Sequence, residues 1–584
     1  MKYISNIIHK IPRPVTRKGI RESLIGAFCL LSLSSCLEET FPTTSTTAAQ
    51  MQQSESSLSG QNNAMAASVM KYGSTYSHAG YPSLMLWRDV YTGQMPVYTT
   101  TYDYFAHSTQ YLGEGQLFYD WWYQYFNTIH QANALVGLVD AATAEKATLA
   151  YLGNAKGYRA WCYMEASQVW EYKKTGVSKL DAQADERNIW GLTVPIVTEK
   201  TTMEQARNNP RAPFYTMYRF IANDLTEAET YLDGYKRTQV NEMDSAAICG
   251  LAARFWLMLG SRFEAAPADL ATQLAHETDN DGYAPLGITS AADCYDLAAK
   301  YAQKAIDGSG EPTTKDQWYD PKSGFNDAIQ SWIFGIEMVP DDNTGAGWKN
   351  FVSFTSPEAD FGVAGITYLA QRLCDQDLYD RIADEDWRKH TWISPDDVGT
   401  DEAVSNYGTL LSGSEFAQQP ELCGLKFHPS QSERVDFKKA AAIDLPIMRV
   451  EEMYYILAEA VGRTQGPAAG AAVLNSFTNK YRYDEAVYAC TPADMDELMD
   501  EILTQKRIEF WGEGIVFWDY KRLGKGVYTK YDGSNHPSSY QHNSPDGVVA
   551  RWMNSYIPSN EYQYNKALED QRNPDPSRTD DMEY

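Results

Sequence analysis

Residues 497–524 read ELMDEILTQKRIEFWGEGIVFWDYKRLG, and a helix-start signal precedes them. The signal is TPAD at 491–494, which offers a cap, a proline suited to a first helical turn and an early acidic residue. We therefore expect a helix from this signal to about Phe510. The sequence WGEG at 511–514 marks its end, because glycines there permit a left-handed turn.

Beyond the glycines, Asp519 and Arg522 are spaced to form an ion pair one helical turn apart. A turn, a cap and a local ion pair all concern how the chain folds. We therefore interpret 497–524 as scaffold and not as a ligand site.

Upstream, apolar residues recur at intervals of three and four, as they do on the buried face of a helix. The stripes are Trp122, Tyr125, Ile129, Ala132, Val136, Val139; Tyr158, Cys162, Ala166, Val169; Tyr218, Ile221, Leu225, Ala228, Leu232; Ile248, Leu251, Phe255, Met258; Cys294, Ala298, Tyr301, Ala305; and Ile447, Val450, Tyr454, Leu457, Val461. Alanines within them, such as Ala155, Ala252 and Ala302, allow neighbouring helices to approach closely. The pattern predicts a mainly α fold of paired helices that resembles tetratricopeptide repeats, without their full consensus.

The expected organisation follows from these stripes and from the segments between them. We assign 1–35 to a signal peptide, 36–60 to a flexible tether, 61–310 to an N-terminal helical region and 311–584 to a C-terminal region. Long stretches rich in Gly, Pro, Asp, Asn and aromatics interrupt the helices at about 80–115, 311–445 and 525–584. Loops of that length in a compact protein are usually functional.

Composition excludes some classes of function. The chain has 77 Asp and Glu against 50 Lys and Arg, a formal net charge of −27, so a nucleic-acid partner is not expected. An apolar fraction of 43% over 584 residues is ample for a large core.

The N-terminus has the features of a lipoprotein signal. Basic residues precede a short apolar run at 24–31, which is too short for a permanent transmembrane helix. The run leads to LSSC at 33–36, which resembles a lipobox, so we expect acylation of Cys36 and attachment to a membrane through lipid. The alternative is an ordinary signal peptide cleaved near the same place, with Cys36 a plain thiol.

Metal and redox signals are weak. The six cysteines after Cys36 are isolated in sequence, so we expect free, buried thiols and no zinc cage. DNDG at 279–282 resembles the start of a calcium loop, but no glutamate follows at the spacing of an EF-hand. We expect no cofactor, although a structural calcium ion is possible.

Aromatic residues cluster in the loops at 81–111 and 318–392. A pyranose has an apolar face and a rim of hydroxyls, so its binding site needs aromatic plates flanked by polar side chains. The predicted plates are Trp87, Tyr98, Tyr102, Trp318, Trp348 and Trp392, with Asp89 and Asn350 as hydroxyl partners. The alternative for each ring is that it fills a gap between loop and helix.

Three C-terminal segments resemble the signature of SusD/RagB-like outer-membrane lipoproteins of Bacteroidota. They are RVEEMYYILAEA at 449–460, AAVLNSFTNKYR at 471–482 and the segment 497–524. Positions Glu509, Phe510, Gly512, Glu513, Gly514, Phe517, Asp519, Arg522 and Gly524 match in register. Val516 replaces the usual arginine, and Lys506 stands where an acid or arginine is usual. Shorter similarities, including GLTVP at 191–195, extend the resemblance from about residue 60 to the end.

The resemblance implies a lipid-anchored receptor on the outer membrane that faces the cell exterior. It would capture an oligosaccharide or polysaccharide without catalysis and deliver it to a SusC-like TonB-dependent transporter. Binding residues in the family lie in variable loops, so the resemblance transfers none of them to this sequence.

Other functions stay open. Peptide capture, as in RagB-like relatives, would use backbone pairing and apolar pockets. A glycoside hydrolase would need only two carboxylates, which 77 acidic residues cannot exclude, although no catalytic motif is present. A purely structural lid with no ligand of its own is a further alternative.

Overall fold

The structure is a computed structural model that describes residues 55–70, 78–100, 105, 116–322, 325–341, 347, 349–365, 370–400 and 403–577. Residues 51–584 form one compact unit. Cys36, Tyr102 and Trp348, along with the predicted signal peptide, lie outside the described residues.

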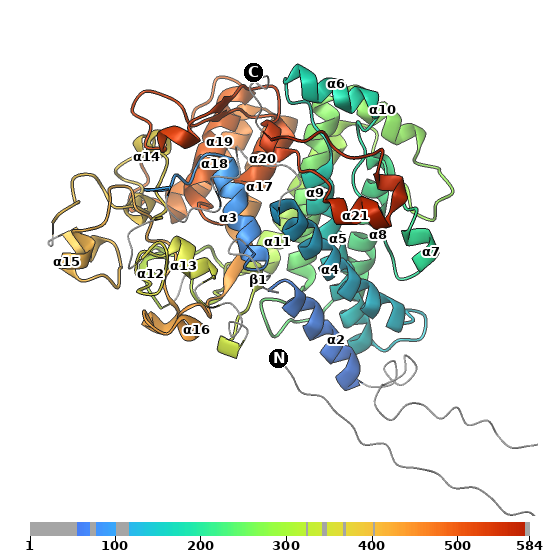
Figure 1. Ribbon diagram of the computed structural model, residues 1–584, viewed down its shortest axis with the longest axis horizontal. Coiled ribbons are helices and arrows are strands. Elements are labelled where there is room, and N and C mark those ends of the chain that lie inside the picture. The colour runs from blue at the N-terminus through green and yellow to red at the C-terminus, as the bar shows by residue number, and fades with distance from the viewer. Residues whose placement is uncertain are drawn as a thin grey trace, which may run out of the picture. The chain divides into compact units, whose positions relative to one another are not determined.

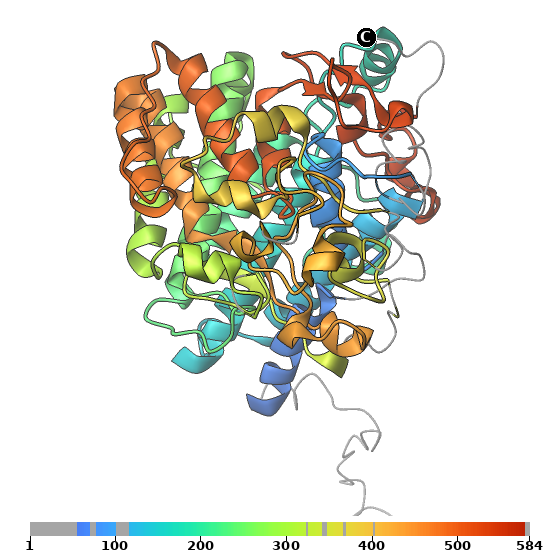
Figure 2. The same cartoon turned by 90° about the vertical axis from the view of Figure 1, so that its left-hand side faces the viewer.

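Long helices make up the scaffold of this unit (Figures 1 and 2). They are α4 (Gln116–Leu138), α5 (Lys146–Trp170), α8 (Phe214–Tyr231), α9 (Ser245–Ala265), α11 (Ala291–Gly308), α17 (Val450–Gln465), α18 (Pro467–Tyr481) and α19 (Met495–Glu509). They pack in pairs, α4 on α5, α5 on α8, α9 on α11, α11 on α17 and α17 on α18. The predicted mainly α scaffold of helical pairs is confirmed.

Close helix approach depends on small residues, as the sequence predicts. Ala155 and Ala160 of α5 are buried. A Cβ atom added to Gly157 of the same helix would lie 2.5 Å from the sulfur of Met243 and 2.7 Å from Cδ1 of Ile248. A larger side chain here would push the neighbouring segment away, because packed interiors have little free volume.

Helix α9 is the one described helix long and apolar enough to cross a membrane by length and composition. Its apolar window is 94% buried inside the protein, where it packs against α11, α8 and α17. It is therefore a central core helix of the unit.

Shorter elements fill the segments between the long helices. The helices are α2 (Glu55–Ser68), α3 (Tyr81–Tyr91), α6 (Ser178–Glu186), α7 (Met203–Ala206), α10 (Pro267–Ala275), α12 (Lys315–Tyr319), α13 (Phe351–Thr355), α14 (Gln376–Asp380), α15 (Gly413–Phe416), α16 (Phe437–Ala440), α20 (Val516–Leu523) and α21 (Ser559–Tyr564). Short 3₁₀ helices are η3 (Trp387–Thr391), η4 (Ala403–Asn406), η5 (Ser430–Ser432), η6 (Ser538–Tyr540), η7 (Arg551–Met553) and η8 (Lys566–Leu568). Two antiparallel pairs join β1 (Trp332–Ile336) to β2 (Leu445–Arg449) and β3 (Val527–Tyr528) to β4 (Asn543–Ser544).

Four predicted boundaries differ from the structure. Ile447 lies in β2 and not in a helix, because an apolar run that pairs with β1 directly precedes α17. Helix α19 begins at Met495, where the carboxylate of Asp494 accepts the N–H of Glu497 at 3.0 Å, so the cap is Asp494. The predicted loop 80–115 begins with helix α3, and α2 begins inside the predicted tether.

The six cysteines after Cys36 are free and buried, as predicted. Asp281, in the segment that resembles a calcium loop, instead forms a bidentate ion pair with Arg219 on α8, at 2.9 and 2.5 Å. Within the described ranges, no group of three or more His, Cys, Asp or Glu is arranged to hold a metal ion.

Candidate functional site

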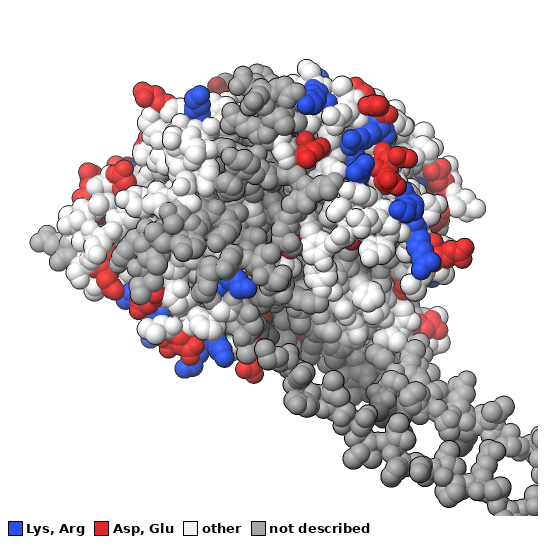
Figure 3. All heavy atoms as spheres, viewed as in Figure 1, with Lys and Arg blue, Asp and Glu red and all other residues white. Residues whose placement is uncertain are grey.

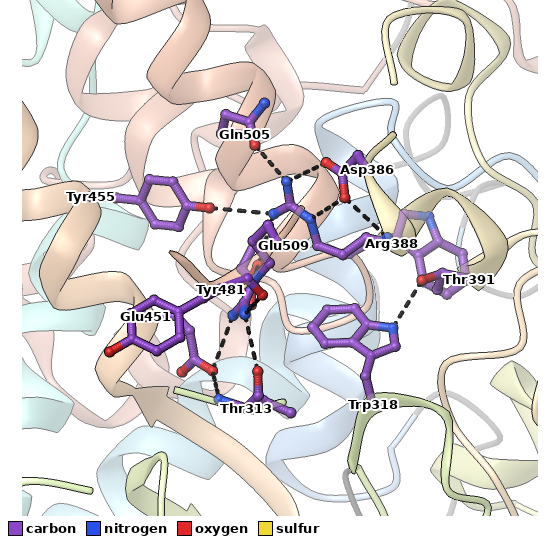
Figure 4. Close-up of polar contacts among 12 residues, drawn as sticks. Thr313, Trp318, Asp386, Arg388, Thr391, Glu451, Tyr455, Tyr481, Gln505 and Glu509 are labelled. Atoms are coloured by element: carbon purple, nitrogen blue, oxygen red, sulfur yellow. Dashed lines mark hydrogen bonds and ion pairs between the residues drawn. The ribbon is translucent and has the colours of Figure 1, made fainter. Parts of the chain in front are cut away.

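The C-terminal motif is built around the buried carboxylate of Glu509 at the end of α19 (Figure 4). Arg388 of η3, Arg449 at the end of β2 and Arg482 after α18 reach it at 2.8, 3.0 and 2.7 Å. Burial alone would raise the pKa of Glu509, but Arg482, Arg449 and Arg388 hold it well below its usual range. The motif therefore ties three segments to one helix end.

The charges of this Glu509 cluster are matched in number. Its members are the cations Arg388, Lys426, Arg449 and Arg482 and the carboxylates Asp386, Glu451, Glu509 and Glu513. Every side chain in it is at most 2% exposed. A charge-matched cluster without solvent access ties these segments together and offers no accessible group to a ligand.

The structure places Trp87 and Asp89 in the core, so their predicted roles are wrong. Trp87 on α3 is 2% exposed and packs against the rings of Tyr91 and Phe105. The Asp89 carboxylate accepts the N–H of Gly512 at 2.5 Å, which anchors α3 to the turn after α19. Burial raises the pKa of Asp89 to about 7.

Trp318, Trp392 and Asn350 are also internal, which corrects three further predictions. The indole N–H of Trp318 donates to Thr391 at 2.9 Å, and Trp392 meets Trp511 edge to face. Asn350 is the N-cap of α13, and its side chain accepts a backbone N–H at 2.9 Å. In this part of the chain, rings fill the gaps between loops and helices, which is the alternative that the sequence left open.

Tyr98 is the one predicted plate that the described residues leave exposed, with 52% of its surface accessible. It follows an isolated bridge between Val97 and Arg372, and its N–H donates to the carbonyl of Gln371 at 2.9 Å. The backbone thus fixes the base of this side chain while its ring faces solvent. Tyr102 and Trp348 belong to the segments outside the description.

The sequence did not predict a pocket of about 410 Å³ that opens beside the indole of Trp190. We call it the Trp190 pocket. It forms where α5, α9 and α20 end, at the first turn of α8 and beside residues 547–549. Trp190 is 39% exposed, its N–H donates to Asp185 at 2.7 Å, and Tyr172 supports the ring edge to face at 5.2 Å. The ring is therefore held in place and open to solvent.

Ionic groups line the same pocket as this plate. The Arg262 guanidinium lies 3.8 Å from the centre of the Phe214 ring and contacts Glu171 at 2.5 Å and Asp269 at 2.8 Å. Burial works against ionisation of Glu171, yet Arg262 and Lys173 lower its pKa to about 2. On the face in Figure 3, basic and acidic side chains intermix over the region of α6, α8 and α10. A pocket with an aromatic plate and ionic hydrogen-bonding groups is suited to binding a polar ring.

One sequence signal lay beside the pocket. Trp190 directly precedes GLTVP at 191–195, a segment that resembles the family, and Gly191 has a φ of +72°. A glycine in that conformation turns the chain where few other residues can. The other lining residues come from segments far apart in the sequence, so spacing alone could not reveal them.

A helical scaffold with an open, aromatic-lined pocket is typical of a ligand-binding protein. Residues 375–575 match the SusD family model. The chain has the fold of a SusD-like carbohydrate binding protein from Bacteroides vulgatus, with a TM-score of 0.65 and 17% identity over 90% of this chain and 98% of the other. No curated protein matches the chain.

Other solved structures agree. A SusD superfamily protein from Bacteroides thetaiotaomicron has a TM-score of 0.59 and 15% identity over 89% of this chain and 99% of the other. A laminarin binding SusD-like protein has a TM-score of 0.58 and 16% identity over 89% and 99%. The chain thus shares the fold of these SusD-like proteins, and its C-terminal third matches the SusD family model.

Proposed function

We propose that this protein captures an extracellular oligosaccharide or polysaccharide without catalysis and without a cofactor. The observation that carries the proposal is the Trp190 pocket, where a supported, exposed indole lies among carboxylate and cationic groups. Such a site offers a flat apolar plate to the C–H face of a sugar and hydrogen-bond partners to its hydroxyls. Two solved relatives with this fold are described as binding carbohydrate and laminarin.

Delivery is the second part of the proposal. Lipid on Cys36 would hold the protein on the outer membrane, facing the exterior, next to a SusC-like TonB-dependent transporter. A receptor held beside its pore raises the local ligand concentration, so modest affinity suffices when several contacts act together. The predicted lipobox at 33–36 and the match of residues 375–575 to the SusD family model support this arrangement.

Calorimetric titration of the purified protein with a panel of polysaccharides and a peptide pool tests the capture. We expect heat of binding with at least one polysaccharide and no new reducing ends after prolonged incubation. Binding of peptides alone would favour the RagB-type alternative, and new reducing ends would favour a hydrolase.

Replacing Cys36 by alanine tests the anchor. We expect the variant to leave the membrane fraction while the wild-type protein stays and co-purifies with a TonB-dependent transporter. Retention of the variant at the cell surface would contradict the lipid anchor.

A further inference from the structure

The Trp190 pocket has more cations than carboxylates to match them. Its lining includes the basic residues Lys173, Lys174, Arg262, Lys521 and Arg522 but only two acidic ones, Glu171 and Asp269. This excess occurs in a protein whose formal net charge is −27. Of the five, Arg522 has its own carboxylate partners outside the lining, Glu459 and Asp519.

The remaining cations share the two carboxylates unevenly. Arg262 contacts both Glu171 and Asp269, and the Lys173 ammonium reaches Glu171 at 3.1 Å. Lys174 is exposed, and no described residue forms an ion pair with it. One cation at the mouth of the pocket is therefore without a counter-charge in the described part of the chain.

Lys521 is a buried member of the pocket lining. Its ammonium donates to the carbonyl oxygens of Val169 and Met553 at 3.0 and 2.7 Å, and among the described residues no carboxylate pairs with it. Burial, followed by the nearby charge of Lys173, brings the pKa of Lys521 well below its usual value. Burial and the charge of Arg262 also lower the pKa of Lys173.

The helix ends at the pocket offset part of this charge. Residues at or just beyond the C-terminal ends of α5, α9 and α20 line the pocket, and each helix end is equivalent to about half a negative charge. Lys173 and Lys174 lie just beyond the last turn of α5, and Lys174 is exposed. Salt screens charges that lie more than about 8 Å apart, so the cations close to a bound anion matter more for holding it than the net charge of −27 does.

We propose that the Trp190 pocket binds an acidic saccharide, with its pyranose ring on Trp190 and its carboxylate or sulfate at Lys174 and Lys173. The inference rests on the proposed glycan capture and specifies the chemical class of ligand at this site. A charge-assisted hydrogen bond to the anionic group adds affinity that a neutral sugar of the same shape lacks.

The test titrates the full-length protein with oligogalacturonate, with the same oligosaccharide after carboxyl reduction and with a sulfated galactan oligosaccharide of equal length. Reduction removes the charge and keeps the linkage, so the first two ligands form a matched pair. We expect the carboxylated form to bind about tenfold more tightly than its reduced form, and the advantage to shrink as salt rises. The sulfated ligand shows whether sulfate can replace carboxylate.

Variants assign the effect to this pocket. Lys174→Glu should remove most of the difference in affinity between the acidic ligand and its reduced form. Trp190→Ala should weaken the binding of the acidic ligand further. Lys530→Glu and Tyr528→Ala change an exposed lysine and an exposed tyrosine outside the pocket and should leave affinity unchanged. Circular dichroism checks that each variant is folded.

Equal affinity for the two forms of the matched pair would overturn the inference while leaving glycan capture intact. If the affinity for the acidic ligand is unchanged in both Lys174→Glu and Trp190→Ala, the inference is also overturned, because the ligand would bind elsewhere. Absence of binding to any polysaccharide, neutral or acidic, would instead contradict the proposed function itself.

Discussion

The Glu509 cluster and the Trp190 pocket use the same kinds of side chain for different ends. Around Glu509, four cations face four carboxylates, and all are shielded from water. Around Trp190, cations outnumber carboxylates, and Lys174 and the indole face solvent. Matching and burial thus separate scaffold from site more reliably than residue type does.

The largest expected loss of stability comes from removing one charge from the Glu509 cluster. Glu509→Gln removes the carboxylate that three arginines share, so we expect a loss of about 3–5 kcal/mol in the free energy of unfolding. Urea denaturation followed by circular dichroism measures it. The control is Glu569→Gln at an exposed position, where the change should stay within about 0.5 kcal/mol. Similar losses in both variants would show that the Glu509 cluster has no special weight.

The turn after α19 is the next most sensitive point. At Gly514 φ is +67°, and an added Cβ would lie 2.6 Å from the carbonyl oxygen of Met85. Gly514→Ala therefore adds a clash to backbone strain, and we expect a loss of about 3 kcal/mol in thermal unfolding. Gly533 has a φ of +84° with no atom within 4 Å, so Gly533→Ala should show the strain alone, about 1 kcal/mol. If the two alanines cost the same, close packing against α3 is not the reason for Gly514.

A smaller effect depends on pH. Burial raises the pKa of Asp89 to about 7 in the folded protein, against an ordinary value of 3.8. The folded state therefore holds this proton more tightly, and its contribution to stability is complete below the unfolded pKa and is lost as pH rises to about 7. The free energy of unfolding of Asp89→Asn, relative to that of the wild type, should therefore rise by up to about 1.4 kcal/mol per pH unit across that window. Denaturation of both proteins at pH 4.5, 5.5 and 6.5 measures the difference, and parallel curves would mean that Asp89 ionises normally.

The smallest effect on the fold is expected at the site. Trp190→Ala should leave the free energy of unfolding within about 1 kcal/mol of wild type and weaken saccharide binding about tenfold. Trp87→Ala, at a ring buried in the core, should lose about 3–5 kcal/mol of stability. Calorimetry and denaturation on both variants provide the comparison. A strong loss of stability in Trp190→Ala would show that Trp190 supports the fold and would contradict its role as a binding plate.

The sequence predicted the scaffold well because helical burial repeats with a period. The stripes through Tyr158 and Cys294 fall on α5 and α11, where they face neighbouring helices. Ile447 was misassigned because an apolar strand runs directly into α17 without a break in hydrophobicity. Asp494 was missed as the cap because Thr491 supplies an equally good signal three residues earlier.

The site could not be predicted in the same way. Whether a loop tryptophan is exposed for binding or buried in the core depends on which segments fold over it. Trp318 and Trp392, which are buried, look no different in sequence from Trp190. Of the predicted plates, Trp87, Trp318 and Trp392 are buried and Tyr98 is exposed, while Tyr102 and Trp348 stay predictions. The Trp190 pocket gathers residues about 350 positions apart, such as Lys173 and Lys521, and only the packed helices bring them together.

The six buried cysteines can report local unfolding of the protein through their reaction with a thiol reagent. Burial raises the pKa of Cys249 and Cys490 to about 11 and those of Cys162 and Cys374 well above the ordinary value. Because the thiolate is the form that reacts, iodoacetamide should label the native protein very slowly. The labelling rate at each cysteine then measures how often its region unfolds locally. A cysteine introduced at the surface can be labelled with a dye while the six buried cysteines stay unlabelled.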